Sequence, residues 1–394
     1  MLRTKVAVFL TCLLVLSLTV TGCGRPSVDE KGISQQANDP YKIGVVLDIS
    51  GKSSSLGVPE RDTIQMLADQ INKKGGINGH PVELIVRDTK SNETEAALAI
   101  KNLIQQNVLA VIGASTSGST MAMVESAQRA EMPLVSCAAS IKIVEPAADR
   151  KWVFKTAQSD SLVATKMIEY LKSKGLTKVA FISVNNAYGD SGRAEFAKVA
   201  AKEGISIVAQ EKFEQDDSMM TSQLTNIRKL NPQAVIAWAI PPAASTLTSN
   251  YRQMGLTMPL IHSHGIGNQT FIKLAGDSAN GVLFPIGKLT VVDSLQADDA
   301  QKGILAQYTN DYKTAYGTPP DPFGGYGYDA FQMVVKAIEK AGADKAKIRD
   351  EIEKTQNFAG VTGIFNMSPI EHNGLALTDL VMVEIKEKKW TIIQ

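Results

Sequence analysis

The feature that most constrains the fold is a regular alternation of short apolar runs with longer amphipathic segments. Residues 43–47 form an apolar run of the length expected for a buried parallel strand, and a helical pattern over 60–74 follows it. Comparable apolar runs, separated from one another by helical patterns, occur at 82–86, 108–112, 133–136, 179–184, 205–209 and 234–238. This alternation predicts an α/β fold in which helices cover both faces of parallel sheets. Because the rhythm restarts after residue 156, we expect two doubly wound lobes.

The end of the chain departs from this rhythm. Helical patterns over 302–316 and 328–341 are followed by two strand-like segments, 380–385 and 389–393, which predict a hairpin. A chain of 394 residues is also too long for one ordinary core. The length therefore agrees with the two lobes that the alternation predicts.

The first residues of the chain indicate export. Arg3 and Lys5 precede an apolar run over 6–20, and small residues lead from that run to Cys23. The run is too short to predict a membrane-spanning helix. Because Cys23 directly follows Gly22, the segment resembles the lipobox of bacterial lipoproteins. An uncleaved anchor with a chance cysteine is the alternative interpretation.

The resemblance to a lipobox implies that Cys23 carries a diacylglycerol as the first residue of the mature protein. We therefore expect residues 1–22 to be a lipoprotein signal peptide. Residues 23–40 are polar and poor in large apolar side chains, so they predict a flexible tether. The protein is then lipid-anchored to the cell membrane and works outside the cytoplasm, in the periplasm or at the outer cell surface.

Charge and cysteine content exclude several classes of protein. The 41 basic and 40 acidic residues nearly cancel, with a formal net charge of +1, so nothing indicates nucleic-acid binding. No later apolar run reaches the roughly 18 residues of a membrane span. Beyond Cys23 the chain has one cysteine, Cys137, which we expect to be a small buried residue rather than a nucleophile.

Two loops rich in small residues follow neighbouring predicted strands. In a doubly wound sheet, ligands bind beyond the carboxyl ends of the strands. The loop 113–120 carries several Ser and Thr hydroxyls and opens a helix, and the loop 136–140 is similar in character. Hydroxyls and free helix N–H groups attract anions. Either loop alone is ordinary turn chemistry, but together they predict a site that clasps one carboxylate.

The sequence favours binding over catalysis. It contains no G-x-S-x-G, Walker, H-E-x-x-H or C-x-x-C motif. A hydrolase that used Ser117 would need a histidine and a carboxylate within reach, and no motif supplies them. His262 and His264 would share one side of a strand, but nothing places His80 or His372 near them. We therefore expect no enzyme activity, no metal site and no cofactor.

Six segments occur in the order found in one family, the leucine/isoleucine/valine-binding type of type I periplasmic binding protein. They are residues 43–47, 51–57, 75–79, 111–113, 187–190 and 325–330. The resemblance covers about residues 41–394 and implies an extracytoplasmic receptor of an ABC importer. In such receptors two lobes close on a ligand by hinge motion, and the closed form is read by the permease.

The resemblance also implies how the chain divides. Three crossings between the lobes are expected near 157–160, 287–291 and 367–372. The first lobe would then comprise residues 41–157 and 290–366, and the second lobe residues 158–289 and 367–394.

Site residues follow from the resemblance position by position. Ser117 and Ser140 correspond to the hydroxyls that hold the ligand carboxylate, and Ala138 and Ala139 supply backbone groups. Tyr188 corresponds to a second-lobe tyrosine that packs on the ligand.

Other positions depart from the amino-acid binders of this family. The acid that pairs with the ligand α-ammonium falls at His264, whose neutral imidazole offers no counter-charge. Family tyrosines are replaced by Leu56 and by Ile240, which is close to Trp238. An ammonium buried without a partner would cost several kcal/mol, so these changes suit a ligand without an amino group.

Two ligand classes remain open at this stage. The stretches 54–61, 152–156, 263–265 and 372–375 are similar to a subgroup associated with aromatic carboxylates such as cinnamic or benzoic acid derivatives. The ligand is then either a hydrophobic or aromatic acid or a branched-chain amino acid, and the missing counter-charge favours the acid. A sensory protein that reports to a membrane receptor, instead of feeding ABC permease subunits, is a further alternative.

Overall fold

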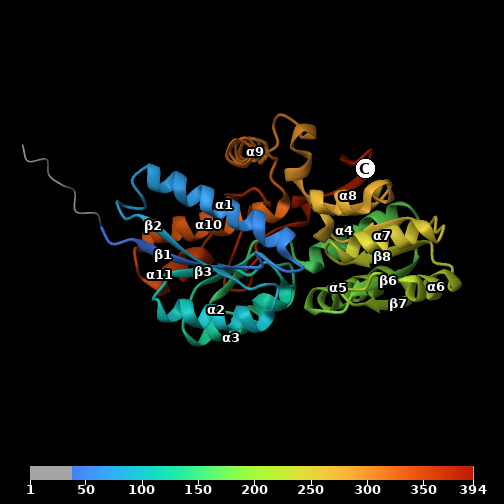
Figure 1. Ribbon diagram of the computed structural model, residues 1–394, viewed down its shortest axis with the longest axis horizontal. Helices are drawn as coiled ribbons and strands as arrows, with labels where there is room; N and C mark the ends of the chain where they lie inside the picture. The colour runs from blue at the N-terminus through green and yellow to red at the C-terminus, as the bar shows by residue number, and fades with distance from the viewer. Residues whose placement is uncertain (1–37, 394) are drawn as a thin grey trace, which may run out of the picture. The chain divides into compact units, whose positions relative to one another are not determined.

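The computed structural model describes residues 38–393. The predicted signal peptide, Cys23 and nearly all of the predicted tether lie outside the described residues. The described chain contains a five-stranded sheet, a seven-stranded sheet and a small two-stranded ribbon (Figure 1). Between residues 38 and 393, no helix combines the length and the apolar character needed to cross a membrane.

The first sheet has the strand order β2-β1-β3-β4-β5, and all its neighbours are parallel. Its strands are β1 (Tyr41–Leu47), β2 (Val82–Asp88), β3 (Ala110–Gly113), β4 (Leu134–Ser136) and β5 (Val153–Lys155). Helices α1 (Ser54–Lys73) and α10 (Pro322–Ala341) cover one face, and α2 (Glu93–Gln105) and α3 (Ser117–Arg129) cover the other (Figure 1). Alternate residues of β1 enter the two cores, Val45 on one side and Val46 on the other.

Two further helices, α9 (Lys302–Tyr316) and α11 (Lys345–Glu353), come from the later part of the chain, and α11 packs against α10. The ribbon pairs β11 (Phe358–Ala359) with β12 (Ile364–Phe365). We call the first sheet and the helices α1–α3 and α9–α11 the first lobe.

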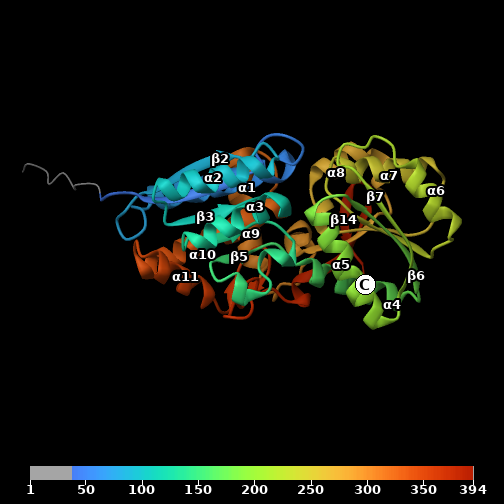
Figure 2. The same ribbon diagram turned by 90° about the horizontal axis from the view of Figure 1, so that it is seen from below.

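The second sheet has the order β14-β13-β10-β9-β8-β6-β7. Its parallel strands are β6 (Lys178–Val184), β7 (Ser206–Phe213), β8 (Ala234–Trp238), β9 (Leu260–His262) and β10 (Leu283–Gly287). Helices α4 (Asp160–Ser173) and α5 (Ala187–Glu203) lie on one face, and α6 (Thr221–Lys229), α7 (Ala243–Gln253) and α8 (Gln269–Ala275) lie toward the other (Figure 2). We call this sheet and these helices the second lobe.

The hairpin predicted at the end of the chain is confirmed. Strands β13 (Leu380–Lys386) and β14 (Lys389–Ile392) pair with each other in antiparallel fashion, and β13 also pairs with β10. The doubly wound α/β fold predicted from the alternation is therefore correct, with an antiparallel hairpin that extends the second sheet.

Three helices begin earlier than the sequence pattern indicated. Helices α1, α5 and α10 begin at Ser54, Ala187 and Pro322, whereas the pattern started them at residues 60, 192 and 328. Their early turns contain glycines, which the pattern assigned to loops. These glycines instead permit close packing, because a Cβ at Gly189 would overlap the carbonyl oxygen of Val184.

The chain passes between the lobes after β5, after β10 and after β12. Hydrogen bonds tie these passages together. The Gln158 side chain donates to the Thr362 carbonyl over 3.2 Å, and the Ser159 hydroxyl donates to the Asn373 side-chain oxygen over 2.8 Å. The lobe boundaries that the resemblance implied stay a prediction.

Candidate functional site

A cavity of about 250 Å³ lies between loops of the first and second lobes. Most of its lining comes from segments that follow strands β1 to β9, at the carboxyl ends of the parallel strands of both sheets, and the rest comes from the start of α10 (Pro322–Ala341). In each sheet, the order in which successive strands are added reverses at one point. This point lies between β1 and β3 in the first sheet and between β6 and β8 in the second. Such switch points open a crevice, so the cavity occupies the place where doubly wound sheets bind ligands.

The first-lobe wall is rich in hydroxyls from the segment between β3 and α3. Ser115, Thr116, Ser117 and Ser119 all line the cavity. The fully buried Asp48, which follows β1, organises this segment. Its backbone N–H donates to the Ser115 hydroxyl over 3.0 Å, and its carboxylate accepts from the Ser119 hydroxyl over 3.2 Å.

Asp48 also accepts a hydrogen bond from the Thr89 hydroxyl. Burial raises the pKa of the Asp48 carboxyl, and these hydrogen bonds oppose that rise. The sequence analysis did not identify Asp48, although its position directly after the first predicted strand was the available signal.

The two serines predicted to hold a carboxylate lie next to each other, but only one faces the cavity. Ser117 is the first residue of α3 and lines the cavity, and its hydroxyl accepts from the Ser140 N–H over 3.2 Å. Ser140 does not line it, since its hydroxyl donates to the Ser191 hydroxyl of the second lobe over 2.7 Å. Ala138 and Ala139 line the cavity as predicted.

The second-lobe wall combines aromatic and apolar side chains with the amides of Asn186 and Gln215. Tyr188 and Ile240 line the cavity, and the Tyr188 hydroxyl donates to the Ser263 hydroxyl over 2.9 Å. Trp238 does not line the cavity, because it is fully buried behind Tyr188 with the two ring centroids 5.9 Å apart. A Cβ at Gly192 would overlap the Trp238 ring, so the glycine makes room for it.

His264 lines the cavity on the second-lobe side as a neutral imidazole. Burial, with a smaller contribution from the charge of Lys155, lowers the pKa of His264 to about 3. Its Nδ1 has no hydrogen-bond partner within residues 38–393. The imidazole therefore brings no charge to the cavity at neutral pH.

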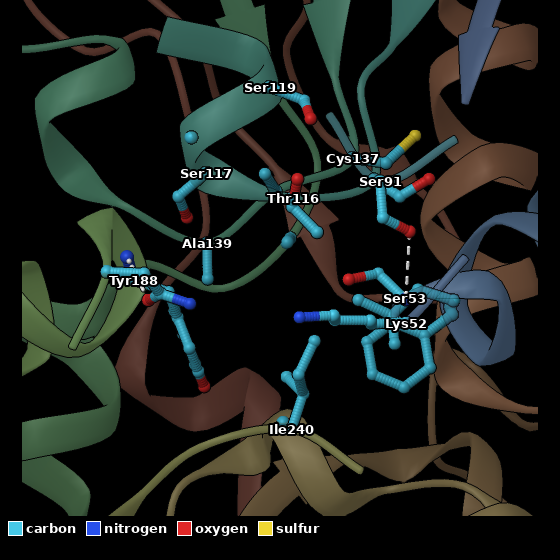
Figure 3. A pocket seen from close by; sticks show the side chains of 18 of the residues that line it. Lys52, Ser53, Ser91, Thr116, Ser117, Ser119, Cys137, Ala139, Tyr188 and Ile240 are labelled. Atoms are coloured by element: carbon cyan, nitrogen blue, oxygen red, sulfur yellow. Dashed lines mark hydrogen bonds between the residues drawn. The ribbon is translucent and has the colours of Figure 1, made fainter. Parts of the chain in front are cut away.

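Among residues 38–393, two charged side chains line the cavity, both from the first lobe, and the sequence analysis missed both. Lys52 reaches into the cavity between Ser117 and Ile240 (Figure 3) and forms an ion pair with Asp216 of the second lobe. Glu93, the first residue of α2, is exposed and also lines the cavity.

Apolar contributions from the first lobe complete the lining. Leu56 lines the cavity as predicted, together with Phe323 and Tyr326 from the start of α10. The two rings of α10 meet edge to face, with centroids 5.7 Å apart. They were missed because the predicted helix began only at residue 328, after both rings.

Cys137 is a buried free thiol, as expected, and burial raises its pKa well above the usual range. Among the described residues no group of three or more His, Cys, Asp or Glu side chains is arranged to hold a metal ion. The cavity is therefore suited to a small organic molecule with an anionic group at the hydroxyl-rich wall and an apolar body at the other.

A family model described as "Periplasmic binding protein" matches residues 40–389. The chain belongs to this family. A curated relative, the leucine-, isoleucine-, valine-, threonine- and alanine-binding protein of Pseudomonas aeruginosa, is 25% identical over 332 residues, which cover 83% of this chain and 85% of the relative. The family that the sequence motifs indicated is therefore confirmed.

Solved structures of the family agree with the fold. An extracellular ligand-binding receptor from Rhodopseudomonas palustris matches with a TM-score of 0.85 and 28% identity, covering 90% of this chain and all of that chain (100%). The branched-chain amino acid transporter substrate-binding protein LivJ from Streptococcus pneumoniae, solved with isoleucine, matches with a TM-score of 0.79 and 26% identity, covering 90% of this chain and 99% of that one. The predicted type I periplasmic binding protein fold is confirmed.

Proposed function

We propose that this chain is the extracytoplasmic solute-binding protein of an ABC importer. It captures a small hydrophobic carboxylate, either a branched-chain amino acid or an aromatic acid, in the cavity between its lobes and delivers it to the permease subunits. The observation that carries this proposal is the position of the cavity at the switch points of both sheets, with a hydroxyl-rich first-lobe wall facing aromatic, apolar and uncharged polar side chains of the second lobe.

The proposed roles follow the two walls. The Ser117 hydroxyl and the backbone of Ala138 and Ala139 bind the ligand carboxylate, while Leu56 and the second-lobe residues Tyr188 and Ile240 pack on its apolar body. Ser140 contributes by placing its N–H on the Ser117 hydroxyl, and Trp238 by supporting Tyr188. His264 closes the second wall as a neutral group.

Binding rather than turnover is proposed for Ser117. A serine of the Ser-His-Asp type needs a histidine that is itself oriented by a carboxylate. The imidazole at this cavity, His264, comes from the opposite lobe, and its Nδ1 has no partner within residues 38–393. The curated relatives matched by the chain are binding proteins, which supports the same conclusion.

The anchor is proposed from the sequence. Membership of the periplasmic binding protein family implies an extracytoplasmic location. A diacylglycerol on Cys23 would hold the protein at the membrane surface, within reach of its permease. Mass spectrometry of the N-terminal peptide of the membrane-bound protein should show a diacylglycerol on Cys23, and a Cys23 without lipid would contradict the anchor.

Thermal unfolding tests the binding function. The protein is heated with a panel of branched-chain amino acids and aromatic acids, each in large excess. A ligand at 100 times its dissociation constant stabilises the folded state by about 2.7 kcal/mol, which raises the midpoint by several degrees. No shift with any member of the panel would reject a hydrophobic carboxylate as the ligand. Ligand-dependent uptake that fails without the partner permease would separate transport from sensing.

A further inference from the structure

We propose that Glu93 of the first lobe pairs with the α-ammonium of the ligand, so that the cavity accepts an α-amino acid. The proposal rests on the proposed function and names the ligand class within it. Because His264 stands where the family has an acid, the sequence analysis expected a ligand ammonium to have no partner. The proposal gives the ammonium Glu93 as its partner instead. The acid comes from the other wall of the cavity.

Local structure fixes where Glu93 lies. The Asn92 side chain caps α2 by accepting hydrogen bonds from the N–H groups of Thr94 and Glu95, at 2.8 and 3.2 Å. This cap sets the first turn of the helix, in which Glu93 is the first residue. The Glu93 carboxylate rests against the start of α3, because a Cβ at Gly118 would overlap its Oε1. The glycine thus gives the carboxylate its place.

Glu93 lines the same first-lobe wall as Ser117. Gly118 directly follows Ser117, the residue whose hydroxyl is proposed to hold the ligand carboxylate. In an α-amino acid, the carboxylate and the ammonium are attached to the same carbon, so both must be recognised at neighbouring points. An acid beside Gly118 and a hydroxyl on Ser117 provide two such points on one wall.

The charge balance of the cavity favours the same ligand. Lys52 is already paired with Asp216, so its charge is offset. Glu93 is the carboxylate that lines the cavity, and the second-lobe wall is neutral at His264. An acid without an amino group would add a second negative charge beside Glu93, whereas a zwitterion brings its own cation to it.

A second acid near the cavity, Asp160, is less suited to this role. Asp160 is fully buried beneath the lining and does not contact the cavity. It lies in the field of Lys155, which is also fully buried, so its charge is partly offset within the protein.

The test compares Glu93→Gln with Glu95→Gln in the full chain, purified in mild detergent. Glu95 is in the same first turn, but it pairs with Lys90 and does not line the cavity. Calorimetry measures the affinity of each protein for leucine, isoleucine and valine, and for 4-methylpentanoate, which is leucine without its amino group. We expect Glu93→Gln to weaken amino-acid binding about tenfold or more, as for a lost charged hydrogen bond, and to leave or strengthen binding of 4-methylpentanoate. Glu95→Gln should leave both affinities unchanged.

The possible outcomes separate the role of Glu93 from the binding function itself. A Glu93→Gln protein that keeps the wild-type ratio of the two affinities overturns the proposal, as does a wild-type protein that binds only acids without an amino group. In both cases the binding function stands. Loss of amino-acid binding in Asp160→Asn but not in Glu93→Gln would assign the ammonium to the buried acid and also overturn it. If the wild type binds no member of either class, the proposed function itself fails.

Discussion

The two walls of the cavity differ in both chemistry and construction. The first-lobe wall consists of loop segments and the start of α3, carries hydroxyls and holds the charged side chains of Lys52 and Glu93. The second-lobe wall carries Tyr188, Ile240 and a neutral His264. In the proposed roles, the first lobe binds the polar end of the ligand, and the apolar body lies against Leu56 of the first lobe and Tyr188 and Ile240 of the second.

Construction follows the same division. Hydrogen bonds between Asp48 and the hydroxyls of Ser115 and Ser119 hold the first wall in place. Substitutions in this wall therefore change the shape of the polar part of the site. The second wall is backed by packed rings, with Trp238 between Tyr188 and Phe181 at centroid distances of 5.9 and 6.1 Å. We therefore expect second-wall substitutions to reduce folding stability and first-wall substitutions to reduce affinity.

Trp238→Ala should have the largest effect. Removal of a fully buried tryptophan leaves a cavity behind Tyr188 and should lower the free energy of unfolding by about 3–5 kcal/mol. Urea unfolding of the ligand-free protein measures the loss. Trp390→Ala is the control, since Trp390 lies on β14 and is partly exposed, and it should cost clearly less. A loss below about 1 kcal/mol for Trp238→Ala would show that the second wall does not depend on its packed backing.

His264→Gln should change how stability depends on pH. The folded-state pKa of His264 is lowered from 6.5 to about 3, so its contribution is present above pH 6.5 and is lost as the pH falls toward 3. Over that window the wild type should lose up to about 1.4 kcal/mol per pH unit that the variant does not lose. Unfolding free energies of both proteins at several pH values give the difference.

Other groups titrate in the same window, and the comparison removes them. Burial raises the pKa of Asp321 and of Asp329 to about 7, so both acids favour the folded state as the pH falls, in the wild type and the variant alike. His80→Gln, at a partly exposed histidine stacked on Tyr41, serves as the control. Parallel stability curves for wild type and His264→Gln would mean that His264 is not held neutral by burial.

Ser117→Ala tests the polar wall. Loss of this hydroxyl should weaken binding by about 1–3 kcal/mol, and it should do so equally for leucine and for 4-methylpentanoate, because both carry the carboxylate. That equality separates Ser117 from Glu93, which distinguishes the two ligands. Ser126→Ala on the outer part of the same helix is the control, since it does not line the cavity. Calorimetry that finds wild-type affinity in Ser117→Ala would remove the hydroxyl from the site.

The sequence predicted the order of helices and strands well, because each element has its own pattern of buried apolar side chains. A strand such as β1 is buried along most of its length, so its residues must be apolar, and the helices between strands show one apolar face each. The loops after β3 and β4 could also be predicted as a site, since the topology alone places them at the carboxyl edge of the sheet.

The rest depended on three-dimensional packing. Lys52 and Glu93 are ordinary surface residues in the sequence, and only the convergence of loops from β1, β2 and β3 brings them to one cavity. Position along the chain also could not show that Ser140 turns its hydroxyl to Ser191, or that Trp238 lies behind the lining. Residues that are close in sequence therefore differ in whether they face the cavity or point away from it.

The ion pair between the two lobes should have the weakest influence on ligand binding. Lys52 and Asp216 come from different lobes, with side chains 56% and 62% exposed, so the pair forms only when the lobes are together and is screened by salt. Breaking it with Lys52→Gln should speed ligand dissociation about 1.4- to fivefold at low ionic strength, which corresponds to the roughly 0.2–1 kcal/mol typical of exposed pairs, and less at high ionic strength. Stopped-flow release of ligand measures the rate.

A charge swap distinguishes a cross-lobe contact from a direct effect on the ligand. If the pair acts by holding the lobes together, Lys52→Asp combined with Asp216→Lys should restore much of the slow release that either change alone removes. The pair Lys340–Glu351 lies within the first lobe, and Lys340→Gln should leave the release rate unchanged. Should the double variant release ligand as fast as Lys52→Asp alone, the ammonium of Lys52 acts on the ligand itself. The first-lobe wall would then bind the ligand through the charge of Lys52 as well as through the groups already proposed.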